Sequence, residues 1–245
     1  MTATWTNLVL VNYRVPPELL RPLVPPGAEL DTPDQAPERH LLSLVALEFT
    51  DLRVRGVPIP TARAFAGVNL RFYVRRGPLR AATFLRQYAP APLVVLGARL
   101  SYRQPYASAA IDHAVRVAGE VIHVHTRLAR RGYRGEIRLR ARNTPETPPP
   151  ESEAHFLKER YWGFGRDRRG RGVRFRVEHP VWRIYPVEDC VVTIDPGVLL
   201  GGAWRELDWS AARHSVVFAE GSPAAIYPAE PLAEAVERRG ESLPR

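Results

Sequence analysis

The sequence predicts a mainly antiparallel β domain of the α+β class, and three observations support that prediction. Segments with the two-residue alternation of strands outnumber segments with helical periodicity. The 24 prolines and 17 glycines divide the 245 residues into many short elements. The regular alternation of strands and long helices typical of a doubly wound α/β fold is missing. We therefore expect one domain over residues 1–245, with a loosely held tail from about residue 231.

The expected elements of the first half are mostly strands. Val68–Arg75 alternates most clearly, because apolar side chains at every second position leave Arg71 and Tyr73 together on the other face. Prolines open and close a short helix at Pro16–Val24. Further strands are expected over Trp5–Tyr13, His40–Val54 and Leu79–Tyr88, and a short helix over Leu93–Tyr102.

The second half begins with an expected hairpin of Ala109–Val117 and Glu120–Leu128, joined through Ala118-Gly119. Ser152 is placed to cap a helix that runs to about Tyr161. Further strands are expected over Tyr133–Arg142, Val173–Glu178 and Trp182–Val187, and a short polar helix from Pro231.

Composition narrows the function classes. The net charge of +9 and a pI near 10 would suit nucleic-acid binding, but 34 of the 35 basic residues are arginines spread along the chain. Only Arg166–Arg176 is dense, so we expect no nucleic-acid partner. Cys190 is the single cysteine. No apolar run is long enough to span a membrane and no leader pattern begins the chain, so we expect no membrane association and a cytoplasmic protein.

Two histidines share one face of an expected strand in the stretch His123-Val124-His125. With Ala118-Gly119 as a two-residue turn, Asp112 would lie opposite His125. Two imidazoles and a carboxylate on one face would suit a divalent metal. No fourth ligand is apparent and Arg116 shares the face, so we favour a solvated polar face and expect neither a metal nor a cofactor.

A second set of side chains gathers arginines and aromatic residues near two prolines. Its members are Arg71 and Tyr73 on one strand face, Arg99, Tyr102 and Tyr106 around Pro105, and His179 and Trp182 around Pro180. Arginine binds a carboxylate through two hydrogen bonds and tyrosine hydroxyls can orient it, so the set would suit an aromatic-walled ligand pocket. Composition alone favours the other interpretation, which is arginine–aromatic packing in an arginine-rich chain.

Five segments carry a family resemblance: PPELLRPLVPPGAEL, VNLRFYVR, LGARLSYRQPY, FLKERYWGF and VEHPVWRIYPVE. In this order they resemble the YqjF-like uncharacterised bacterial family, over nearly the whole chain to about Val187. That family is placed in the acetoacetate decarboxylase-like superfamily. The resemblance therefore implies a closed or nearly closed antiparallel β-cone with small helices outside it. The habit of the superfamily also admits a homodimer.

The chain departs from true acetoacetate decarboxylases where their chemistry takes place. In those enzymes a segment similar to LGARLSYRQPY ends in Tyr-Pro and two lysines, and the first lysine forms a Schiff base with the keto acid. Here Pro105 matches the proline, but Tyr106 and Ala107 stand where the lysines would be. Relatives often carry an acid two residues before the asparagine of VNLRFYVR, where this chain has Gly67. The resemblance thus implies the cone without Schiff-base decarboxylation.

Lys158 is the single lysine of the chain, on the helix expected from Ser152. Its glutamate-rich surroundings predict a solvated side chain, so we do not expect it to replace the missing lysines.

We expect a protein that binds a small, partly apolar, anionic molecule, such as a carboxylate or keto acid, inside the cone. Arg71 and Arg99 would hold the anion, the three tyrosines would orient it, and Trp182 would form an apolar wall. His179 and Tyr106 are the acid–base candidates for a non-imine lyase, isomerase or hydrolase acting on such a ligand. Metal binding at Asp112, His123 and His125 and nucleic-acid binding at Arg166–Arg176 stay open as alternatives.

Overall fold

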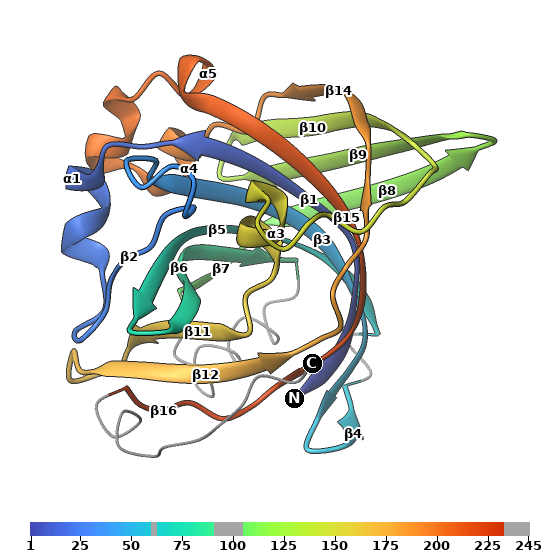
Figure 1. Cartoon of the computed structure of the whole chain (residues 1–245). Coiled ribbons are helices and arrows are strands. Elements are labelled where there is room, and N and C mark those ends of the chain that lie inside the picture. Colours follow the sequence, from blue (N-terminus) through green and yellow to red (C-terminus); the bar gives the residue numbers. More distant parts are fainter. Residues whose placement is uncertain (60–62, 91–104, 233–245) are drawn as a thin grey trace.

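The computed structural model describes residues 1–59, 63–90 and 105–232, which are mostly strands (Figure 1). Within this part, twelve strands form a large sheet and four form a smaller one. The main strands of the large sheet are β1 (Thr2–Arg14), β3 (Leu41–Val54), β5 (Ala64–Arg76), β6 (Leu79–Ala89), β11 (Trp162–Arg166), β12 (Gly172–Glu178) and β15 (Arg213–Ile226). Short strands flank them: β2 (Glu29–Leu30), β4 (Val57–Pro58), β7 (Tyr106–Ser108), β13 (Ile184–Tyr185) and β16 (Glu230–Pro231).

The large sheet closes on itself. Its order runs β15-β1-β3-β5-β6-β11-β12, and β12 also pairs with β15 through Val177–Ile226 and Glu178–Ala225. The central strands are long and antiparallel, whereas β11 meets β6 through one parallel pair, Gly163–Ala82. The result is the antiparallel cone that the family resemblance implied, and Figure 1 shows its strands curving around a central space.

The smaller sheet covers the outside of the cone. Its order is β14-β10-β9-β8, formed by β8 (Ala110–Ala118), β9 (Val121–Arg130), β10 (Tyr133–Arg142) and β14 (Val187–Val192). A large apolar cluster lies between the sheets, with Val9, Leu44 and Phe72 from the cone and Ile122 and Leu139 from the small sheet. Since strand residues alternate, the other face of β1, β3 and β5 points into the cone.

A second apolar cluster fills part of the cone interior. The helix α3 (Glu153–Lys158) lies on the concave side of β1, β3 and β5 (Figure 1), and its Phe156 and Leu157 pack against Leu10, Tyr73 and Trp182. The Ser152 hydroxyl accepts from the His155 N–H at 3.2 Å, which confirms the expected cap. The helix ends at Lys158 rather than near Tyr161, because the chain then enters β11.

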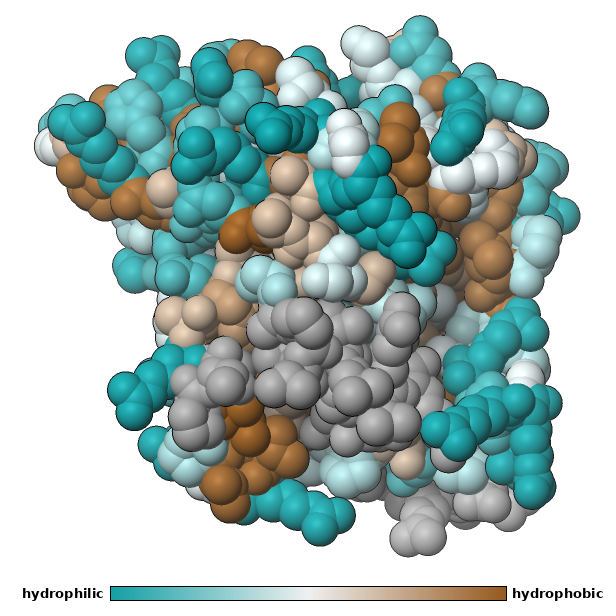
Figure 2. Space-filling view, turned by 180° about the vertical axis from the view of Figure 1, so that it is seen from behind, coloured by the Kyte–Doolittle hydropathy of each residue, from teal (hydrophilic) through white to brown (hydrophobic). Residues whose placement is uncertain are grey.

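Among the described residues, the other helices are one or two turns long and lie outside the cone. They are α1 (Pro17–Leu20), α4 (Pro196–Leu200) and α5 (Trp209–Ala212), with 3₁₀ turns at Arg21–Leu23 and Gly202–Glu206. Figure 2 shows hydrophilic side chains over most of the described part of the rear face, with apolar ones in small groups. No helix in the described ranges is long and apolar enough to cross a membrane.

The hairpin register differs from the expected one. Its loop is Gly119-Glu120 instead of Ala118-Gly119, so each β8 residue pairs two positions further along β9. The shift of two keeps every side chain on its expected face but changes its partner. The expected helix at Leu93–Tyr102 and most of the tail after residue 231 lie outside the described residues.

Candidate functional site

Arg71 is a buried cation on the inner face of the cone. It is 8% exposed, and its Nη2 donates to the Leu157 carbonyl oxygen at 2.8 Å. Its Nε has no hydrogen-bond partner, and no carboxylate of the described residues forms an ion pair with it. The buried Asn69 Oδ1 on the same strand face also lacks a partner. A buried charge without a counter-ion is costly, so this position is suited to an anion supplied from outside the chain.

Tyr73 is brought beside Arg71, as the sequence predicted, but its hydroxyl is already engaged. The hydroxyl lies 2.5 Å from Ser43 Oγ and 3.2 Å from the Leu157 carbonyl oxygen. Ser43 continues this buried network to Asn12 at 2.6 Å. Tyr73 therefore holds α3 against the sheet through the Leu157 carbonyl oxygen.

Lys158 contradicts the expectation of a solvated side chain. Its side chain is fully buried and Nζ forms an ion pair with Glu159 Oε1. Burial lowers the pKa of Lys158, and Glu159 opposes that shift. Lys158 is buried because this end of α3 lies inside the cone, where Phe156 and Leu157 are buried as well. The signal that could have revealed it is its uniqueness, since all other basic residues are arginines.

Glu159 is the buried carboxylate at the centre of the His179 cluster, which consists of Lys158, Glu159, Tyr161, His179 and Trp182. Its Oε1 accepts from the Trp182 backbone N–H at 3.0 Å, in addition to Lys158. Its Oε2 accepts from the Tyr161 hydroxyl at 2.9 Å and lies 3.7 Å from His179 Nδ1. Glu159 was not among the residues predicted from the sequence.

His179 and Trp182 lie together, as expected from their positions around Pro180. The His179 ring stacks on Trp182 at 4.0 Å and faces Tyr161 at 4.9 Å between ring centroids. Its Nδ1 lies 2.9 Å from the Pro180 carbonyl oxygen, which can only accept, so Nδ1 carries the proton. Nε2 is then the basic nitrogen of the neutral ring. Burial lowers the pKa of His179, and the charges of Arg71 and Lys158 act in the same direction.

Trp182 closes one side of the cluster. It is 1% exposed, and its indole Nε1 donates to Ser222 Oγ at 2.8 Å. Trp5 meets it edge-on at 6.1 Å between centroids, and Phe49 meets Trp5 in the same way. Trp182, Trp5 and Phe49 thus form a continuous row of apolar rings beside His179.

Gly67 lies against the ring of Phe49. A Cβ at Gly67 would lie 2.7 Å from Cε2 of Phe49, whose ring stacks on Phe65. A side chain at position 67 would therefore require the Phe49 ring to shift.

Tyr106 begins β7 and pairs in parallel with Gln87 at the end of β6. Its side chain is half-buried. The residues of the His179 cluster belong to other parts of the chain, namely the segments that follow α3 and β12. Arg99 and Tyr102, the other two expected ligand contacts, lie outside the described residues.

The suggested metal ligands do not gather. Asp112 lies opposite Arg127 and forms an ion pair with it at 2.5 Å, because of the register shift. His125 is bound instead by Glu136 of β10, at 2.7 Å. Within the described ranges, no three histidine, cysteine or carboxylate groups are placed to share a metal ion.

The arginine-rich segment forms the β11–β12 hairpin, and several of its side chains are engaged within the protein. Arg166 donates to the carbonyl oxygen of Val24 at 2.6 Å, and Arg171 forms an ion pair with Asp167 at 2.8 Å. Arg174 binds Glu230 at 2.7 Å and lies over the Trp162 ring. These contacts reduce the positive charge that the hairpin offers to a polyanion.

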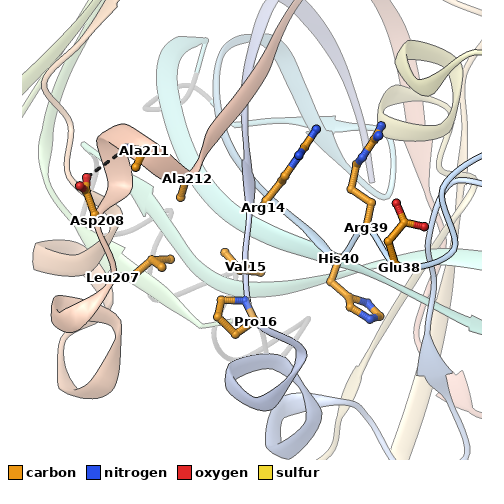
Figure 3. Close-up of a pocket in the computed structure, with 10 residues that line it drawn as sticks. All are labelled: Arg14, Val15, Pro16, Glu38, Arg39, His40, Leu207, Asp208, Ala211 and Ala212. Atoms are coloured by element: carbon orange, nitrogen blue, oxygen red, sulfur yellow. Dashed lines mark hydrogen bonds between the residues drawn. The ribbon is translucent and has the colours of Figure 1, made fainter.

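A separate pocket of about 400 Å³ lies outside the cone, between the end of β1, the segment before β3, and α5. Figure 3 shows Arg14 and Arg39 pointing the same way from its wall and Asp208 on the far side. Arg39 is paired with Glu153 at 2.7 Å, and Arg14 donates to His214 at 3.1 Å. Asp208 caps α5. Arg14, Arg39 and Asp208 thus each have a partner within the chain, unlike the Nε of Arg71.

Comparisons with known proteins agree with this architecture. The DUF2071 family, described as an uncharacterized conserved protein, matches residues 2–223. The uncharacterized protein YqjF of Bacillus subtilis (strain 168) is 33% identical over 163 residues, which span 66% of this chain and 65% of that protein.

Solved structures with low sequence identity share the fold. The chain superposes on acetoacetate decarboxylase from Legionella pneumophila with a TM-score of 0.61 at 12% identity, covering 93% of this chain and 85% of that one. An acetoacetate decarboxylase-like enzyme from Sphingomonas wittichii RW1 gives 0.61 at 14%, covering 94% and 92%. The enduracididine biosynthesis enzyme MppR, complexed with pyruvate, gives 0.61 at 14%, covering 94% and 90%. The chain therefore belongs to the DUF2071 family and has an acetoacetate decarboxylase-like fold.

Proposed function

We propose that this protein binds a small, partly apolar organic anion inside the cone, with Arg71 holding the carboxylate. The observation that carries the proposal is the buried Arg71 guanidinium, which has an unpartnered Nε and no carboxylate partner among the described residues. Bidentate binding of a carboxylate would satisfy this guanidinium and compensate its charge. The surrounding rings of Trp182, Trp5 and Phe49 favour a ligand with an apolar portion.

The ligand class is a carboxylate or keto acid. MppR, a structural neighbour, has been seen in complex with pyruvate, which is a keto acid. Arg99 and Tyr102 belong to the same proposal as second contacts, and Tyr106 as an orienting hydroxyl. The cytoplasmic location expected from the sequence stays a prediction.

Thermal-shift fluorimetry and calorimetry test the anion site. The panel holds pyruvate and longer keto acids, short and medium fatty acids, and aromatic acids. We expect one class to raise the melting temperature of the native protein and to lose that effect in Arg71→Met. The matched control is Arg75→Met, since Arg75 lies on the same strand but is half-exposed and paired with Glu29. Equal ligand shifts in the native protein and Arg71→Met would remove Arg71 from the site.

Schiff-base chemistry is predicted to be absent, although Lys158 is closer to the cluster than the sequence suggested. Burial lowers the pKa of Lys158, but its Nζ is engaged in an ion pair with Glu159 that opposes this shift, and an ammonium group held in this way has no lone pair for attack on a carbonyl. Borohydride reduction in the presence of pyruvate, followed by mass spectrometry, is expected to leave the chain unmodified. A covalent adduct on Lys158 would overturn this part of the proposal and leave anion binding by Arg71 intact.

A second candidate function is acid–base catalysis on the bound anion by His179. It is favoured by the ring geometry, because Nδ1 is held by the Pro180 carbonyl oxygen and Nε2 is left as a base. If the ligand is turned over, His179→Gln should abolish turnover while retaining binding, because Gln cannot accept a proton at neutral pH. Unchanged turnover in His179→Gln would exclude this role.

A further inference from the structure

We propose that the free edge of β8 pairs with the same edge of a second copy of this chain, forming a two-fold dimer with a continuous sheet. The strand β8 ends the small sheet, and among the described strands it pairs only with β9. Figure 1 shows the β8–β9 hairpin reaching past the strands of the cone, and no residue of Ala110–Ala118 is buried.

The hairpin loop fixes which backbone groups of β8 are free. Gly119-Glu120 is a two-residue loop, so the flanking pair Ala118–Val121 exchanges both backbone hydrogen bonds. Counting back in steps of two, the even-numbered residues bond to β9 and the odd-numbered ones face away from it. The N–H and C=O groups of Ile111, His113, Val115 and Val117 therefore point to the edge, and no described backbone group pairs with them.

The sequence of this edge is complementary to itself. When two β8 strands run antiparallel with Ala114 opposite the partner's Ala114, Asp112 lies opposite the partner's Arg116, and the reverse pair forms by symmetry. The four outward-facing residues then form hydrogen-bonded pairs, which gives about eight backbone hydrogen bonds at two per pair. The small side chains of Ala110, Ala114 and Ala118 allow the remaining positions to approach closely.

The charges leave both partners available for this pairing. Arg116 is exposed and has no carboxylate partner among the described residues. Asp112 is half-exposed and uses one oxygen, Oδ2, for Arg127. Moving the two-fold axis to His113 or to Val115 would place alanines opposite Asp112 or Arg116, so charge pairing selects the axis at Ala114.

The apolar side of the edge also lacks cover. Val117 is 59% exposed, although it shares a face with Ile111 and Val115, which pack on the core between the sheets. In the proposed dimer the partner's Ile111 lies opposite Val117 and shields it. The edge has no proline, no lysine and no bulge within Ala110–Ala118, the usual devices that prevent strand addition.

Sedimentation velocity over a range of protein concentrations tests the dimer. We expect the native protein to dimerise and Arg116→Asp, which places two carboxylates opposite each other twice, to raise the dimer dissociation constant at least about tenfold. The charge-swapped double variant Asp112→Arg/Arg116→Asp restores opposite charges across the axis and should dimerise again. Arg134→Asp, an exposed arginine on the inner strand β10, is the control and should remain dimeric.

Two results would overturn the proposal. A native protein that is monomeric at every concentration has no such interface. A dimer that Arg116→Asp leaves unchanged, or that the charge swap does not restore, is formed by another surface. Circular dichroism of each variant separates loss of pairing from loss of folding.

Discussion

At the scale of single residues, we expect the substitution of Arg71 to have a large effect on ligand binding and a small effect on the free energy of unfolding. Removing its charge should abolish anion binding but cost the unliganded protein little. Arg71→Met loses the hydrogen bond to Leu157, worth about 1 kcal/mol, and removes an uncompensated buried charge. We expect the free energy of unfolding in urea to stay within about 1 kcal/mol of the native value or to rise.

Arg160 provides the contrast for this prediction. It is also buried, but its Nη1 lies 3.1 Å from Oδ2 of the buried Asp31. Arg160→Met would leave that buried carboxylate to the more distant Arg80, whose Nε lies 3.7 Å away, at a cost of about 3 kcal/mol. Equal losses of stability in the two arginine variants would mean that Arg71 has a counter-ion in the unliganded protein.

Lys158 is expected to behave like Arg160. Lys158→Met leaves the buried Glu159 carboxylate without a cation, so we expect a loss of about 3 kcal/mol in the free energy of unfolding at neutral pH. Lys158→Met combined with Glu159→Gln should lose less, because the amide carries no charge and its oxygen still accepts from the Trp182 N–H. A double variant less stable than the single one would argue against an ion pair as the source of the effect.

At the scale of elements, Gly221 lies where β15 pairs with the first half of β1, opposite Thr6. Its φ is +82°, and an added Cβ would lie 2.0 Å from the Trp5 carbonyl oxygen. Gly77, in the turn between β5 and β6, has φ +54° and open space around it. Gly77→Ala should cost about 1 kcal/mol of backbone strain. Gly221→Ala adds a backbone clash and should cost at least about 3 kcal/mol. Thermal unfolding of both variants measures the difference, and similar shifts would show that β1 and β15 separate without penalty.

The elements that were predicted correctly are those whose pattern is local. The alternation of Val68–Arg75 gave β5 and both of its faces, and Tyr133–Arg142 has the bounds of β10. The inner face of β5 was polar in sequence, and it is buried only because the cone closes around it. Burial of Arg71 and Lys158 thus depends on contacts between segments far apart in the chain, which no local pattern contains.

The loop of the β8–β9 hairpin shows the same limit on a smaller scale. Alternation determined which side chains share a face, but a register shift of two residues leaves every side chain on the same face and changes only its cross-strand partner. The expected pair of Asp112 and His125 therefore became Asp112 with Arg127. The positive φ of Gly119, +61°, suits either turn, so the glycine alone did not choose between them.

At the scale of the whole molecule, closure of the cone decides where the side chains of Arg71, Lys158, Glu159 and His179 lie. The β12–β15 contact joins two segments almost fifty residues apart through only two residue pairs. Closure brings α3, which precedes β11, and the His179 loop, which follows β12, to the same interior. Residues brought together by closure in this way are scattered in the sequence, which is why the place of Glu159 beside His179 and Trp182 was not predicted, whereas His179 and Trp182 were expected to lie together from their positions around Pro180.

The whole molecule should also lose stability in mild acid. Burial lowers the pKa of four histidines, His40, His113, His155 and His179, and that of His113 to about 4. The unfolded chain therefore binds protons that the native state does not, and stability is lost as the pH falls from about 6.5 towards 4.

For His113 alone the loss in the free energy of unfolding between pH 7 and pH 5 is about 2 kcal/mol. His113→Gln can still bond Thr126 but cannot titrate, so urea unfolding at the two pH values should show a pH-dependent loss smaller by that amount. The same pH dependence in the native protein and His113→Gln would mean that this histidine is protonated in the folded state.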